Sequence, residues 1–169
     1  MFLSAANTLD RRTVLLGSLG ARSSLTSVDV SATDVLQECF IPECGFLAFA
    51  RGMATLLRRR GVEALNVSIR HSPADRVSAL PWAQQEVFSF VLYHKQRTWR
   101  SAQERVATWT RDLIDLALPQ GGRYYLPYQR HASAGQFARA YPEAEQLRGL
   151  KPVVDPNGKF SNELWRQYL

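Results

Sequence analysis

The run Leu65-Asn66-Val67-Ser68-Ile69-Arg70 alternates strictly between apolar and polar side chains. Because successive side chains of a strand point to opposite faces of a sheet, the run predicts a strand with an apolar core face. Its polar face carries Asn66, Ser68 and Arg70. The next strand is predicted over residues 86–95, where a nearly continuous apolar run indicates that both faces are covered.

Two amphipathic helices and two further strands surround this pair. The helices are predicted over residues 46–57, ending at Gly61, and over residues 99–117 with Thr98 as the N-cap. The first and fourth strands in the sequence are predicted over residues 35–41 and 123–128, the latter with Pro127 near its end. Short helices are expected over residues 133–140, 142–149 and 162–168.

The order strand, helix, strand, strand, helix, strand is typical of the split βαβ, or ferredoxin-like, arrangement. We therefore expect an α+β fold in which two helices cover one face of a four-stranded antiparallel sheet, with C-terminal helices added. The other face is expected to stay open and to carry polar and aromatic side chains. An exposed face of this kind indicates packing against a domain, a ligand or a second subunit.

Composition narrows the class of protein. The 169 residues are 46% hydrophobic, which suits one domain plus a tail, and no run reaches the roughly 18 apolar residues of a membrane span. The net charge of +6 comes from scattered arginines, so nucleic acid is not a favoured partner. Cys39 and Cys44 lack neighbours of metal-ligand spacing, so no metal site is predicted. Both are expected to be reduced and mostly buried, which favours a cytoplasmic protein.

The N-terminal residues 1–33 are rich in Ser, Thr and Ala and show little periodicity. They are expected to form an irregular leader or the remnant of a preceding domain. Within them, the stretch from Asp10 through Arg11 and Arg12 to Gly17 is similar to a twin-arginine export signal, although its apolar part is short and interrupted by Arg22. Export is therefore the alternative to a cytoplasmic location.

The C-terminal run Asp155-Pro156-Asn157-Gly158-Lys159-Phe160-Ser161-Asn162 is a turn before the last helix, with Phe160 as an apolar anchor. With residues 150–151 and 164–165 it resembles the C-terminal signature of FAD-linked oxidoreductases of the vanillyl-alcohol-oxidase superfamily. The strands 35–42, 66–71 and 123–128 and the run 90–96 occur in the matching order. Residues 34–169 look most like the cap, or substrate, domain of the D-arabinonolactone oxidase and alditol oxidase branch.

The resemblance implies an enzyme in which a hydroxyl-bearing sugar, lactone or alcohol transfers a hydride to the flavin of FAD. No phosphate-binding glycine-rich pattern occurs in the chain. We therefore expect a partner domain or subunit to bind most of the FAD, and we expect this chain alone to be incomplete and inactive.

The resemblance also implies site residues. Arg70 and Tyr128 are the expected catalytic residues. Arg70 keeps the arginine of a Glu-x-Arg pair whose glutamate is replaced by Ser68, and Tyr128 takes the position of a lysine close to the flavin. The remaining candidates are substrate-binding Ser68, Tyr93, His94 and Tyr125, and cofactor-binding Asn66 and Asn162.

Two other functions remain open at this point. A basic ferredoxin-like sheet with exposed aromatic side chains is also typical of non-catalytic modules that bind RNA or protein. The predicted third strand lacks the glycine-rich aromatic pattern of an RNA-recognition motif, which argues against RNA. Alternatively, the open face mediates a homodimer without catalysis.

Overall fold

The computed structural model describes residues 31–169, which form one compact unit. The expected leader, up to residue 30, and its twin-arginine-like stretch lie outside the described residues. Within the described chain, no helix is long and apolar enough to cross a membrane.

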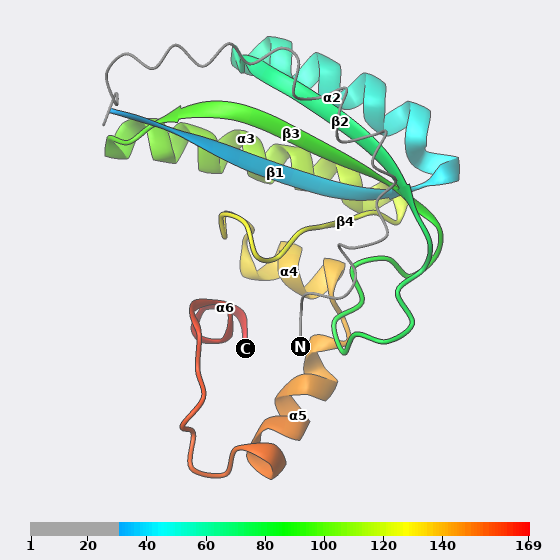
Figure 1. Cartoon of the computed structure of the whole chain (residues 1–169), viewed down its shortest axis with the longest axis vertical. Helices are drawn as coiled ribbons and strands as arrows, with labels where there is room; N and C mark the ends of the chain where they lie inside the picture. Colours follow the sequence, from blue (N-terminus) through cyan, green and yellow to red (C-terminus); the bar gives the residue numbers. More distant parts are fainter. Residues whose placement is uncertain (1–30) are drawn as a thin grey trace, which may run out of the picture. The chain divides into compact units, whose positions relative to one another are not determined.

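Four antiparallel strands form one sheet in the order β2-β3-β1-β4. They are β1 (Ala32–Pro42), β2 (Ala64–Ser72), β3 (Val87–Arg97) and β4 (Arg123–Tyr124). The central pair is β1 and β3, which are joined along their whole length (Figure 1). This strand order is that of the split βαβ arrangement, so the predicted α+β fold class is confirmed.

The main core lies between one face of the sheet and the helices α2 (Phe46–Arg60) and α3 (Arg100–Ala117). Their apolar faces form an amphipathic pair, as predicted from the helical spacing. Phe49 contacts Phe90 with ring centroids 5.0 Å apart. The other principal members of this core are Ile41, Met53, Leu92, Trp109 and Leu113.

The side chains of strand β2 alternate between the two faces of the sheet as predicted, but of the three apolar residues expected to face the core only Val67 packs against it, and Ile69 is 44% exposed. Ser68 and Arg70 stand opposite Val91 and Ser89 of β3, on the face away from α2 and α3. A bulge between Ala64 and Asn66 interrupts the register, and Leu65 is 55% exposed rather than part of the core face.

Three predicted boundaries are wrong. β4 contains two residues instead of six, because the chain leaves the sheet once the N–H of Tyr125 has donated to Glu38, and Pro127 has no N–H to continue the ladder. Helix α3 begins at Arg100 with Trp99, not Thr98, at the N-cap. Helix α5 (Ala144–Val154) continues five residues beyond the predicted end.

The second face of the sheet carries a smaller apolar cluster at one end. Phe40 of β1 packs against Trp82 of the long β2–β3 loop, with ring centroids 4.8 Å apart, and Tyr125 contacts Phe40 from the other side. Ala83 and Val87 complete this cluster. None of its members belongs to a helix. The rest of this face carries polar and aromatic side chains together with Leu36 and Val91.

The C-terminal part continues beyond β4 through α4 (Ala134–Ala140), α5 and α6 (Glu163–Tyr168) (Figure 1). The predicted turn is present: the carboxylate of Asp155 accepts hydrogen bonds from the backbone N–H groups of Lys159 and Phe160, and Gly158 has a φ of 62°. The expected apolar anchor is absent, since Phe160 is 75% exposed.

Candidate functional site

Charged and phenolic side chains gather on the second face of the sheet, beyond the Phe40 cluster. Glu38 of β1 is only 10% exposed, and its Oε1 lies 3.7 Å from Nη2 of Arg70, which reaches across from β2. Ser89 of β3 hydrogen-bonds the Glu38 carboxylate from between them. The structure thus brings a carboxylate of β1 and a guanidinium of β2 together across β3, the strand between them.

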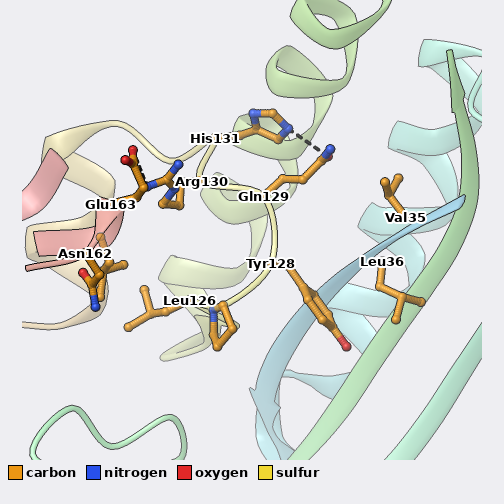
Figure 2. A pocket seen from close by; sticks show the side chains of 11 residues that line it. Val35, Leu36, Leu126, Tyr128, Gln129, Arg130, His131, Asn162 and Glu163 are labelled. Atoms are coloured by element: carbon orange, nitrogen blue, oxygen red, sulfur yellow. Dashed lines mark hydrogen bonds and ion pairs between the residues drawn. The ribbon is translucent and has the colours of Figure 1, made fainter. Parts of the chain in front are cut away.

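Tyr128 completes this group from the segment that follows β4. Its ring lies 4.7 Å from that of Tyr125 in an edge-to-face arrangement. Figure 2 shows Tyr128 reaching from this segment over β1, on the same side as Leu36. We call Glu38, Arg70, Tyr125 and Tyr128 the open-face cluster.

The pKa shifts in the open-face cluster indicate which of its side chains donate protons and which one accepts them. Burial raises the pKa of Glu38 above its usual value, and Arg70 and the hydrogen bond with Ser89 only partly oppose this. Burial, and then the negative charge of Glu38, raises the pKa of Tyr128, so its hydroxyl stays protonated near neutral pH. Tyr128 and Arg70 are therefore donors, whereas Glu38 is an acceptor whose pKa lies above that of an ordinary glutamate.

Arg70 holds a buried donor that is not paired within the described part of the chain. Its Nε is buried and has no acceptor among the residues that the structure describes. A guanidinium N–H without a partner is costly when it is buried, so a ligand oxygen placed there gains a strong, charge-assisted hydrogen bond.

Three other predicted site residues lie on the same face. Ser68 and Asn66 lie on β2 on the same face as Arg70, and they stand opposite Val91 and Tyr93 of β3. Tyr93 hydrogen-bonds Asp34, and this bond, followed by burial, raises the pKa of Tyr93. These residues stand along the open face, while Arg70 and Tyr128 meet at Glu38.

His94 is not brought to this cluster. It lies on the helix-covered face of β3, 2% exposed, with its ring 4.8 Å from that of Trp109. Burial, and then the neighbouring His131, lowers the pKa of His94 to about 4. Its predicted substrate-binding role would require a route through the core.

A groove of about 820 Å³ runs beside Tyr128. Figure 2 shows Val35 and Leu36 of β1 on one side of it and Leu126 and Asn162 on the other. The Oδ1 of Asn162 accepts the N–H of Trp165 as the N-cap of α6, so only its amide nitrogen could serve a cofactor. Further lining is provided by Pro127, Gln129, Arg130, His131, Glu163 and Leu164.

The sequence reasoning missed Glu38. The available signal was its position in the strand: Glu38 shares its face with Leu36 and Phe40, so it lies opposite the core residues Cys39 and Ile41. The expectation that both cysteines are buried is correct only for Cys39, since Cys44, which follows β1, is exposed.

Comparison of the chain with known protein families and with curated proteins gives no match. No group of side chains among residues 31–169 has the composition of a metal site.

Proposed function

We propose that this chain is the substrate-domain portion of a FAD-dependent oxidoreductase that oxidises a hydroxyl-bearing substrate. The observation that carries the proposal is the open-face cluster, in which Arg70 and Tyr128, expected from the resemblance to be catalytic, converge from β2 and from the segment after β4. Convergence of two such side chains, far apart in the sequence, on a face that no helix of residues 31–169 covers suits a substrate site.

The described residues suit one part of FAD and not another. The groove beside Tyr128 has the size of a small-molecule site, and the amide nitrogen of Asn162, which lines it, could contact a flavin ring, whereas Asn66 on β2 does not line this groove. The sequence has no glycine-rich loop for a pyrophosphate. In this proposal a partner domain or subunit holds most of the cofactor, and the present chain covers the ring.

When bound, the flavin supplies the hydride acceptor. The chain's own residues bind and orient the substrate. The Arg70 guanidinium donates to a substrate oxygen and stabilises negative charge that develops there. The protonated Tyr128 hydroxyl is a second donor beside it, and Ser68, Tyr93 and Tyr125 are available to further hydroxyl groups of the substrate.

Helix α5 offers a candidate contact surface for the proposed partner. Its last turns expose the apolar side chains of Leu150, Val153 and Val154, and Phe160 is exposed nearby in the following turn. Of the α5 residues only Ala144 is buried. A helix that leaves this much apolar surface in water is typical of one that is covered in an assembly.

The first experiment is to express the chain alone and together with the product of the neighbouring reading frame, and to record the visible spectrum of each sample. We expect a flavin absorption band in the co-expressed sample. An alditol and an aldonolactone are then tested for bleaching of that band. The variants Arg70→Met and Tyr128→Phe should keep the band and slow bleaching, whereas Arg76→Met, which changes an exposed loop arginine, should keep the band and bleach at the wild-type rate. Colourless protein in both samples would refute the proposal.

A further inference from the structure

Glu38 occupies the centre of the open face, on one of the two central strands. Its carboxylate is nearly enclosed, with Arg70 from β2, Ser89 from β3 and Tyr128 from the segment after β4 around it. Strictly structural carboxylates are usually held by close, well-aligned partners, but here the nearest guanidinium nitrogen stands at 3.7 Å.

The pair formed by Glu38 and Arg70 is complementary to a hydroxyl group. A hydroxyl both donates and accepts one hydrogen bond. The Glu38 carboxylate is an acceptor, and the buried Nε of Arg70 is a donor with no acceptor among the described residues. A substrate hydroxyl seated between them would satisfy both groups at once.

No other group of the cluster suits the role of proton acceptor. Arg70 has only donors, and Tyr125 and Tyr128 are phenols, of which Tyr128 is held in its protonated form by burial and by Glu38. On the same face, Asp34 is exposed at the far end of β1 and is engaged with Tyr93, beside the exposed Lys95. His94 lies on the opposite face.

We propose that Glu38 is the general base of this site and takes the proton of the substrate hydroxyl that Arg70 holds. This inference rests on the function proposed above. The O–H proton passes to the Glu38 carboxylate, the C–H bond breaks with its electron pair leaving as hydride to the oxidised flavin, and the C=O bond forms. The substrate loses two electrons and two hydrogens, the flavin gains the hydride, and Glu38 later returns its proton to water.

The environment of Glu38 favours this role. Burial raises the pKa of its carboxyl group, while Arg70 and the hydrogen bond with Ser89 partly oppose this by favouring the ionised form. A base whose pKa lies nearer the working pH takes a proton more readily than an ordinary surface carboxylate.

The test compares Glu38→Gln and Glu38→Asp with the wild type in the flavin-containing complex. Glu38→Gln should leave the flavin content unchanged and slow flavin reduction about 100-fold to 10,000-fold, the usual contribution of a general base. It should also abolish the acidic limb of the pH profile, and Glu38→Asp should recover part of the rate. Glu86→Gln, which changes an exposed carboxylate, is the matched control and should behave as the wild type.

A second readout needs no flavin. In the chain alone, an NMR titration of the Glu38 carboxyl carbon should give a midpoint above that of an ordinary glutamate, and Arg70→Met should raise it further. A wild-type rate and pH profile in Glu38→Gln, or an ordinary midpoint insensitive to Arg70, would overturn the role of Glu38 while leaving the oxidoreductase proposal standing. Absence of flavin from every sample would remove both.

Discussion

Acid should destabilise this protein through His94, whose neighbours offer no compensation for a charge. Neither ring nitrogen has a hydrogen-bond partner in the described part of the chain, and burial lowers the pKa of the imidazole from 6.5 to about 4. The folded protein therefore binds this proton less tightly than the unfolded chain does. The free energy of unfolding should be fully retained above pH 6.5 and should fall as the pH drops from 6.5 towards 4.

The size of the effect follows from the same shift. A tenfold change in proton affinity corresponds to about 1.4 kcal/mol, so the full contribution of His94 is about 3 kcal/mol. Carboxylates also titrate in this range, so the total loss in the wild type will be larger. The contribution of His94 is the difference between the wild type and a variant that lacks the titrating ring.

His94→Phe is the informative variant, because a phenyl ring keeps an aromatic contact with Trp109 and has no nitrogen to protonate. Urea unfolding at several pH values between 7.5 and 4 measures both proteins. We expect the variant to lose about 3 kcal/mol less than the wild type across this range. His131→Asn serves as a control for the second histidine, whose pKa is also lowered, first by burial and then by Arg111. Equal pH dependence in the wild type and His94→Phe would refute the reasoning.

Three further pairs of substitutions, each a variant with its control, test a close backbone contact, an ion pair and the C-terminal turn. Gly122→Ala should lower the free energy of unfolding by about 3 kcal/mol in urea titrations, because its Cβ would stand 2.8 and 2.9 Å from the backbone oxygens of Ala117 and Phe40. The control is Gly149→Ala in α5, whose Cβ meets open space, and it should be neutral or stabilising by up to about 1 kcal/mol. Glu143→Gln should cost about 3 kcal/mol by calorimetry, because Arg123, 5% exposed, loses its carboxylate partner at 2.9 Å, and a cost as small as that of Gln84→Ala would contradict this. Asp155→Ala should lower the Tm more than Asn157→Ala does, because Asp155 holds the C-terminal turn; equal Tm values would count against that role.

The sheet could be predicted from local patterns because its strands carry strong signals. The alternation of residues 65–70 and the helical stripe of residues 99–117 each depend on one element and its neighbours. The ends of β4 and α5 could not be predicted in the same way. β4 stops where tertiary contacts of Tyr125 redirect the chain, and α5 continues through Gly149, its predicted end, and includes Pro152 in its last turn.

The site was harder to predict because its residues meet across strands. Tyr93 and His94 were both expected to bind substrate, yet neighbouring residues of a strand point to opposite faces, so one of them had to face the core. The apolar run of β3 hides which one, since Val91 on the open face is as apolar as Phe90 and Leu92 on the core face. Glu38 stands out only when β1 is placed next to β3, which brings Arg70 within reach over Ser89.

The central position of β1 also has a consequence for how the chain acquires its structure. Both strands that pair with β1 follow it in the sequence, and the nearer partner, β3, comes only after α2, β2 and the long β2–β3 loop. Closing such long loops is slow, so the domain should fold in milliseconds to seconds rather than microseconds. In a chain that emerges from the ribosome, Phe40 and Ile41 would stay unpaired until β3 is made. In stopped-flow refolding of the whole chain, slow pairing of β1 with β3 would appear as a delay in tryptophan fluorescence.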